Sequence, residues 1–402
     1  MVCAIRRQPI SLLAGSQRRQ PAGNLSFVPS RITAIYHVRS DARAIQARAQ
    51  AIALEQSVEM PLSAIEDQRI LDEIVGRVED ISDIGNGTFA VRIDLAAATI
   101  GEDPGQLMNM LFGNTSLQDD VTLYDAEFPN EIMIGNRSGP HYGVAGQRHR
   151  TGIESRAFTC TALKPQGLAP DKLAELATRF ARGGIDFIKD DHGIANQSYS
   201  PFELRVNAVA DALRKVQEET GHLAHYAPSI TGTARAARNY IAQARIAGLE
   251  HVMVQPMILG LSNFRDLVDG HPSVSFFAHP ALAGASRIDP ALLFGKIFRM
   301  LGADASIFPN HGGRFGYSAE TCRRIADAAR APWHGREAAI PVPAGGMTTH
   351  RVGEMLDFYG ADVMLLIGGA LLDARARLTE ETAAFVKKVK DHRYAEGAGT
   401  SA

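Results

Sequence analysis

Charged side chains follow two short apolar segments of the chain. One is Lys164, and the other is the run Lys189-Asp190-Asp191-His192. A lysine beside an apolar surface can lose its proton near neutral pH and serve as a base. Carboxylates and an imidazole next to it can bind a hard cation or move a proton. A solvated charged turn is the alternative for either segment alone, and two such lysines together favour a catalytic role.

Three further candidates follow apolar segments later in the chain. His279 comes directly after residues 274–278, where an imidazole can act as an acid, a base or a substrate contact. A hydrogen-bonded structural histidine fits that position equally well. His311 and Arg314 lie in a glycine-containing stretch of the kind that closes over a substrate.

Two glycine-rich turns are candidates for a phosphate site. They are Ala344-Gly345-Gly346 and Gly368-Gly369, and each follows an apolar segment. Paired glycines expose backbone N–H groups, which suit a phosphate. For either pair alone the alternative is a tight turn in which glycine supplies a positive φ. Two pairs after consecutive predicted strands favour the phosphate site.

A regular set of elements must position these residues. Between residues 148 and 395, short apolar segments alternate with longer segments that have helical spacing of their apolar residues. The predicted strands are 158–163, 185–189, 224–227, 251–255, 274–278, 305–308, 340–343 and 363–367. The predicted helices are 170–182, 202–219, 234–247, 290–301, 319–329, 349–359 and 370–389. This alternation predicts an α/β fold, a (β/α)8 TIM barrel, in which the candidate residues stand at the carboxyl ends of the strands. The segment between the fourth and fifth predicted strands gives the weakest support for this alternation.

The residues before the barrel divide into two parts. Residues 1–31 contain five arginines and no acidic residue, which predicts a basic, flexible extension, with a transit peptide as the alternative. Residues 32–147 predict a small α+β domain, with strands at 32–38 and 87–93 and helices at 42–54 and 104–112.

Composition excludes several classes of function. The chain has 402 residues, and 42 Lys and Arg residues stand against 44 Asp and Glu residues, for a net charge of −2. This balance gives no electrostatic basis for binding nucleic acid, and no apolar run is long enough for a membrane span. The three cysteines lie far apart in no metal or redox spacing, which favours a reducing, cytoplasmic location.

The motifs together resemble the RuBisCO large-subunit superfamily. The run from Gly183 to Asp191 resembles its signature of two glycines, a hydrophobic residue, Asp-Phe, a variable residue and Lys-Asp-Asp. Residues 161–165 resemble its Thr-x-x-Lys-Pro segment, and residues 340–346 and 368–369 resemble its phosphate loops. Residues 112–114 and 139–143 match positions of its N-terminal domain, so the resemblance runs from about residue 32 to about residue 390.

The resemblance implies a ferredoxin-like α+β domain before the barrel and assembly as a homodimer or a higher homo-oligomer. Glu55 and Asn114 would contribute substrate-binding side chains to the active site of the neighbouring subunit. In the family the lysine at the position of Lys189 is carbamylated and, with following acids such as Asp191, holds Mg²⁺.

Four departures from the family pattern bear on function. His192 stands where a third metal-binding acid is expected, and imidazole is a poor partner for Mg²⁺. Arg314 is the cation nearest the position of a loop lysine needed for carboxylation, while Gln166 and Pro280 replace an active-site lysine and a phosphate-binding arginine. These losses imply a RuBisCO-like protein that does not fix CO2.

RuBisCO-like proteins act as isomerases, enolases, decarboxylases or hydrolases on phosphorylated keto-sugars or sugar acids, through an enolate. The resemblance implies Lys164 or Lys189 as the proton carrier and His279 as a substrate contact. For the metal site of carbamylated Lys189, Asp191 and His192 it leaves three alternatives, which are a weakened Mg²⁺ site, a transition ion, or no metal. Substrate would also be bound by Arg314, Ala344, Gly345, Gly346, Gly368 and Gly369. A catalytically silent homologue with a binding or regulatory role is the alternative.

Overall fold

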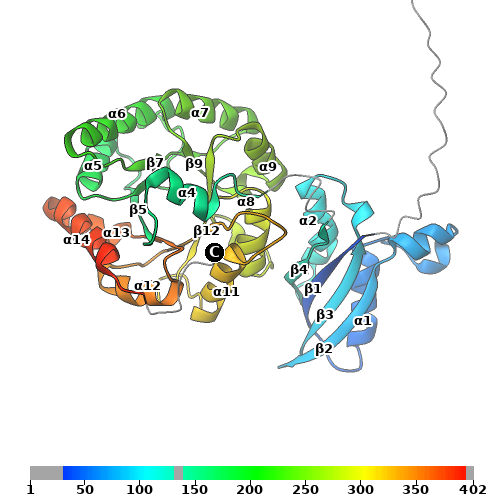
Figure 1. The fold of residues 1–402 in the computed structure, drawn as a ribbon. Helices are drawn as coiled ribbons and strands as arrows, with labels where there is room; N and C mark the ends of the chain where they lie inside the picture. The colour runs from blue at the N-terminus through cyan, green and yellow to red at the C-terminus, as the bar shows by residue number, and fades with distance from the viewer. Residues whose placement is uncertain (1–29, 131–138, 395–402) are drawn as a thin grey trace, which may run out of the picture.

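The computed structural model describes residues 30–130 and 139–394. The predicted extension 1–31 lies almost wholly outside the described residues. An antiparallel sheet with two helices comes first, and two parallel sheets that together form a ring inside a ring of helices follow (Figure 1). No helix among the described residues is long and apolar enough to cross a membrane.

The N-terminal part is a four-stranded sheet in the order β2-β3-β1-β4. Its elements are β1 (Arg31–Arg39), α1 (Ile45–Glu55), β2 (Arg77–Gly85), β3 (Thr88–Ala96), α2 (Pro104–Phe112) and β4 (Val121–Glu127). Alternate residues of β1 are buried, because one face of the sheet packs against the helices. The Tyr36 hydroxyl on that face donates to the Leu111 carbonyl of α2 at 2.6 Å. This order of strands and helices confirms the ferredoxin-like prediction.

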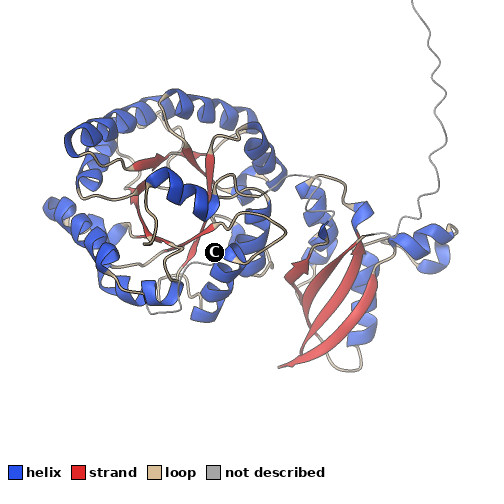
Figure 2. Ribbon diagram, viewed as in Figure 1, coloured by secondary structure: helices blue, strands red, loops and turns tan. Residues whose placement is uncertain are grey.

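The second part is the predicted barrel, drawn in Figure 2 as red strands inside blue helices. Its strands are β5 (Phe158–Leu163), β6 (Phe187–Asp190), β7 (His225–Ala227), β8 (Ser229–Ile230), β9 (His251–Val254), β10 (Ser275–Ala278), β11 (Ala305–Pro309), β12 (Ile340–Ala344) and β13 (Met364–Leu366). β7 pairs with β6 and β8 pairs with β9, so Pro228 divides the third strand of the ring in two. Proline has no N–H group to donate to a strand ladder, which accounts for the break.

The helices of the outer ring agree with the sequence except at three places. They are α5 (Pro170–Arg182), α6 (Phe202–Thr220), α7 (Ala234–Ile246), α8 (Pro256–Leu259), α9 (Leu261–Gly270), the π-helical turn η6 (Ala291–Ile297) with α10 (Phe298–Met300), α11 (Ala319–Arg330), α12 (Val352–Tyr359), α13 (Gly369–Leu372) and α14 (Leu378–Asp391). Between the fourth and fifth strands, where the sequence predicted no helix, the structure has α8 and α9. The single helix predicted at 370–389 is wrong, because Arg375 has a φ of 48° and separates α13 from α14. Residues 290–301 form η6 and α10 rather than a regular α-helix.

The short helix α4 (Gly143–Thr151) lies across the ring (Figure 1). Asp304 accepts hydrogen bonds from the amides of Tyr142, at 2.6 Å, and Gly143, at 2.9 Å, and so caps the start of α4. Val144 packs against the side chains that fill the barrel interior. The predicted division of the chain between residues 147 and 148 stays a prediction, and α4 crosses it.

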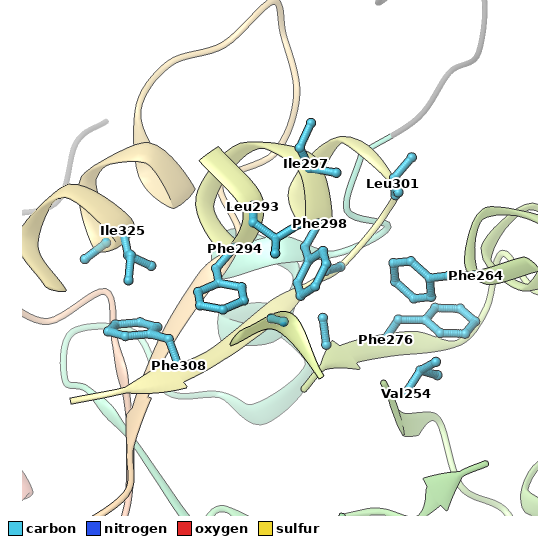
Figure 3. Close-up of a cluster of buried hydrophobic side chains, with 14 of the residues drawn as sticks. Val254, Phe264, Phe276, Leu293, Phe294, Ile297, Phe298, Leu301, Phe308 and Ile325 are labelled. Carbon is cyan, nitrogen blue, oxygen red and sulfur yellow. The ribbon is translucent and has the colours of Figure 1, made fainter. Parts of the chain in front are cut away.

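Two clusters of apolar side chains stabilise the barrel. One fills its interior and includes Phe158, Phe187 and Phe277. The other lies between the strands and the outer helices. Figure 3 shows the part of this second cluster around β9, β10, β11 and η6, with Val254, Phe264, Phe276, Leu293, Phe294, Ile297, Phe298, Leu301, Phe308 and Ile325 labelled. The strand ends are therefore held on both sides by packing, which fixes the side chains that follow them.

Candidate active site

A cavity of about 750 Å³ opens at the carboxyl ends of the barrel strands. Apart from Asp190 and His311, the candidate residues predicted on the barrel line it: Lys164, Lys189, Asp191, His192, His279, Arg314, Ala344, Gly345, Gly346, Gly368 and Gly369. His311 lies outside its lining, and the His311 ring packs against Phe358 with centroids 4.7 Å apart.

Lys164 and Asp191 form an ion pair at the end of β5 and β6. The Lys164 Nζ lies 3.0 Å from Asp191 Oδ2, while Asp191 Oδ1 lies 3.2 Å from His192 Nδ1 and accepts the Gly193 amide at 3.0 Å. Burial opposes ionisation of Asp191. The hydrogen bonds from His192 and Gly193 and the Lys164 cation outweigh that effect and hold the pKa of the carboxyl well below its usual range. Asp191 is therefore a carboxylate, and it keeps a cation beside the cavity.

Lys189 is in a different environment. Its side chain is 4% exposed, and its Nζ donates to the Asp190 carbonyl at 3.0 Å. Burial lowers the pKa of Lys189, because an ammonium loses hydration in an apolar surrounding and gains little from one carbonyl. The two lysines of the site are thus distinguished by their surroundings, since Lys164 stands in an ion pair with Asp191 and Lys189 is buried with one carbonyl as its acceptor.

His192 and His279 stack face to face, with ring centroids 4.5 Å apart and an angle of 10° between the rings. Burial, and then the nearby Lys189 and His192, lower the pKa of His279 to about 2, so His279 is neutral at physiological pH. The Ala281 amide donates to His279 Nδ1 at 3.2 Å, which assigns the imidazole proton to Nε2. His279 can therefore offer one neutral N–H donor to a bound molecule.

Asp190 does not line the cavity, although it lies between two residues that do. Its carboxylate accepts from Arg205 Nε at 3.1 Å, from the Tyr226 hydroxyl at 2.6 Å and from the Ser229 amide at 3.0 Å. Successive residues of a strand point to opposite faces, so anchoring Asp190 outside the barrel orients Lys189 and Asp191 toward its mouth. Sequence reasoning missed Arg205, which sits fifteen residues later on α6.

The glycine turns present free backbone donors. Gly345 and Gly346 have φ values of 79° and 102°, and a Cβ on Gly346 would lie 2.9 Å from the Gly313 Cα. Glycine is therefore required at Gly346. Among the residues that the structure describes, the amides of Gly345, Gly346 and Gly368 have no hydrogen-bond acceptor. Unpaired N–H groups in turns that line a cavity suit an anion.

Arg314 lies next to the same glycine turns. Its backbone nitrogen would be 3.3 Å from a Cβ on Gly346, and its guanidinium lies 5.0 Å from the Phe315 ring. Within the described part of the chain Arg314 has no carboxylate partner. The cation is therefore available to a bound anion.

Glu55 and Asn114 lie in the N-terminal part and do not line the cavity of their own chain. Asn114 Nδ2 donates to Glu55 Oε1 at 3.0 Å and to Glu59 Oε1 at 3.1 Å. The structure thus brings the two predicted residues together with Glu59, which sequence reasoning did not identify.

The residues predicted to hold Mg²⁺ do not fit that ion as they stand. Mg²⁺ prefers an octahedron of oxygen ligands. Here one carboxylate, Asp191, faces an imidazole and an amine, and its two oxygens already accept from Lys164, His192 and Gly193. Within residues 30–130 and 139–394, no group of three or more His, Cys, Asp or Glu residues could hold a metal ion.

Comparisons with known proteins agree with this geometry. The family model for the catalytic domain of the ribulose bisphosphate carboxylase large chain matches residues 143–374. The 5-methylthioribulose-1-phosphate isomerase of Rhodospirillum rubrum is 56% identical over 360 residues, which cover 89% of this chain and 96% of that protein. The 2,3-diketo-5-methylthiopentyl-1-phosphate enolase of Geobacillus kaustophilus is 30% identical over 84% of this chain and 86% of its own length.

Among solved structures, the Rubisco-like protein from Rhodopseudomonas palustris has a TM-score of 0.85 and 49% identity, and the alignment covers 91% of this chain and 99% of that one. The match thus extends over both the sheet and the barrel. The chain belongs to the ribulose bisphosphate carboxylase large-chain family, as its motifs predicted, and within that family to the RuBisCO-like enzymes of the isomerase and enolase type.

Proposed function

We propose that this chain is an isomerase of 5-methylthioribulose 1-phosphate or of a closely similar phosphorylated keto-sugar. The observation that supports this most directly is the 56% identity to the isomerase of that name over nearly the whole chain. Such an isomerisation removes a proton from a carbon beside the carbonyl, passes through an enediolate and returns a proton to a different carbon. It needs a base, a positive charge near the enolate oxygen and a phosphate site.

The cavity offers a residue for each need. Lys189 is our candidate for the base, because its burial favours the neutral amine. Lys164 is the candidate for the enolate oxygen, because it lines the cavity and its Nζ forms an ion pair with Asp191. The free amides of Gly345, Gly346 and Gly368, with Arg314, form the candidate phosphate site. His279 donates from Nε2 to a substrate oxygen in this scheme.

The proposed steps involve no metal, because the donor set does not fit Mg²⁺. A carbamate on Lys189 would add a second carboxylate, but the Asp191 oxygens would still be shared with Lys164 and His192. We expect EDTA to change neither the activity nor the melting temperature, and added bicarbonate to have no effect. Strict dependence on Mg²⁺ and CO2 would show that the metal site forms after all.

We further propose that the active enzyme is at least a homodimer. Glu55 and Asn114 are held together but stand outside the cavity of their own chain, so a second chain is needed to bring them to a barrel mouth. A cytoplasmic location is part of the same proposal, and the buried, unpaired thiols of Cys160 and Cys322 support it.

The test is deuterium exchange in D2O, followed by ¹H NMR with 5-methylthioribulose 1-phosphate. The wild-type chain should exchange a carbon-bound proton beside the carbonyl and form an isomer. Lys189→Met should abolish exchange, and Lys164→Met should reduce it by a factor of about 10²–10³, as expected for loss of one group that stabilises an oxyanion. Lys172→Met, at an exposed ion pair on α5, is the matched control and should exchange normally. A wild-type chain that neither exchanges nor binds the substrate would leave the catalytically silent alternative.

A further inference from the structure

One arginine of the barrel is hydrogen-bonded to three backbone carbonyls of the N-terminal part. Arg287 Nε donates to the Val121 carbonyl at 3.1 Å, and its Nη2 donates to the carbonyls of Gln118, at 2.7 Å, and Ser116. These acceptors run from the turn η4 (Asn114–Leu117) to the first residue of β4. A guanidinium offers several donors in a planar, rigid fork, so one such side chain can fix the course of a turn. Arg287 thus ties η4 to the barrel of its own chain.

The backbone around Arg287 is itself fixed. The Leu123 amide of β4 donates to the Arg287 carbonyl at 3.0 Å, and the Asp289 amide donates to the Leu123 carbonyl at 2.8 Å. Asp289 also forms a two-point ion pair with Arg324 of α11, with distances of 3.1 and 3.0 Å. Residues 287–289 therefore connect the edge strand β4 to the outer helices of the barrel, and the Arg287 side chain reaches η4 from a fixed backbone.

Gln56 holds η4 from the other side. Gln56 is 2% exposed, and its side chain accepts from the Thr115 amide at 3.1 Å and donates to the Met110 carbonyl at 2.7 Å. Gln56 follows Glu55 in the chain, and Thr115 follows Asn114, so this contact brings Glu55 and Asn114 side by side. Gln56 thus fixes η4 relative to the N-terminal helices, whereas Arg287 fixes it relative to the barrel.

We infer that Arg287 is a positioning residue for Asn114, and through Asn114 for the active site of the neighbouring subunit. This inference rests on the proposed function and on the proposed homodimer. Asn114 stands outside the cavity of its own chain, so its place at another barrel depends on how η4 is held on the barrel that carries it. A misplacement of about 1 Å in a group that contacts substrate can lower the rate about 100-fold.

The alternative is an effect of Arg287 within its own chain. Residues 280–284 line the cavity of that chain and lie just before Arg287 in the sequence. The two possibilities predict a defect in different barrels of the dimer. If Arg287 acts through Asn114, the cavity of the variant chain itself stays competent, and the active site that it helps to complete is the one impaired.

The experiment measures deuterium exchange with 5-methylthioribulose 1-phosphate in hybrid dimers purified through two different tags. One chain carries Arg287→Met and the other Lys189→Met, so the barrel that keeps its base receives η4 from the chain that keeps Arg287. We expect the Arg287→Met homodimer to lose about 10- to 100-fold in kcat/KM, and the hybrid to reach about half the wild-type value. A hybrid of wild-type and Lys189→Met chains also has one working barrel and should give the same value. A hybrid as impaired as the Arg287→Met homodimer would overturn the inference and leave the isomerase proposal standing.

Two single variants separate positioning from a general loss of folding. Arg287→Lys keeps an ammonium that can reach one carbonyl without the rigid fork, so it should recover part of the loss, and its hybrid tests the inference even where Arg287→Met folds poorly. Arg182→Met is the matched control, at an exposed ion pair with Glu219, and should leave kcat/KM unchanged. An Arg287→Met homodimer with wild-type kcat/KM, or a fully active monomeric wild-type chain, would overturn the inference alone. A wild-type chain without exchange would overturn the proposed function itself, and this inference with it.

Discussion

Replacing Arg205 with methionine should destabilise the barrel strongly, although Arg205 touches no cavity atom. Arg205 and Asp190 are both wholly buried, and the Arg205 Nε donates to the carboxylate at 3.1 Å. In Arg205→Met the Asp190 carboxylate stays buried with the Tyr226 hydroxyl and the Ser229 amide as donors, but with no cation. Removing one member of a buried pair costs about 3–5 kcal/mol. For a cooperative unit of barrel size this corresponds to a decrease in melting temperature of roughly 6–10 °C.

The assay is thermal unfolding followed by circular dichroism, at one protein concentration because the chain is proposed to form dimers. Arg214→Met is the matched control, with the same substitution on the same helix at an exposed pair with Asp211. Exposed pairs contribute about 0–1 kcal/mol, so the control should melt within about 2 °C of the wild type. In the double variant Asp190→Asn/Arg205→Met the buried charge is gone, and part of the stability should return. Equal melting temperatures for Arg205→Met and Arg214→Met would refute the reasoning.

Three further results are expected. Gly346→Ala should raise KM for the phosphorylated substrate, because its Cβ would collide with Gly313, while kcat/KM for any unphosphorylated analogue stays unchanged. The pH profile of kcat/KM should rise with pH as Lys189 loses its proton, with its midpoint below the ordinary lysine value of about 10.4, and a midpoint at or above that value would contradict a buried base. His251 is buried with a pKa well below 6.5, so the folded state binds fewer protons than the unfolded state below that pH. Stability should then fall with acidification, and His251→Asn, measured by urea unfolding at pH 6.5 and 5.5, should reduce that fall by up to about 1.4 kcal/mol per pH unit.

Much of the fold could be predicted because local signals and packing agree. Residues 104–112, 158–163 and 170–182 fold with the predicted bounds, since each combines a clear start or a continuous apolar run with a suitable period. The strand β2 was missed although Asn86-Gly87, a typical hairpin turn, directly follows it. That turn would have identified the β2–β3 pair.

The grouping of most barrel candidates around one cavity could be predicted from the sequence, but their electrostatics could not. A barrel brings the carboxyl ends of its strands together, so Lys164, Lys189 and His279 had to meet. Their different surroundings depend on contacts that spacing does not encode, such as the ion pair of Lys164 with Asp191. The outward position of Asp190 follows from strand alternation, whereas its partner Arg205 depends on how α6 packs.

The position of α4 determines how molecules travel to and from the chemistry. Asp304 fixes α4 at one end of the barrel, and the side chains next to Val144 fill the interior above it. The mouth lined by Lys164 and the glycine turns is therefore the opening through which substrate enters and product leaves. Product must dissociate through this opening before another substrate molecule binds, so product should be a competitive inhibitor. Widening the opening should accelerate product release.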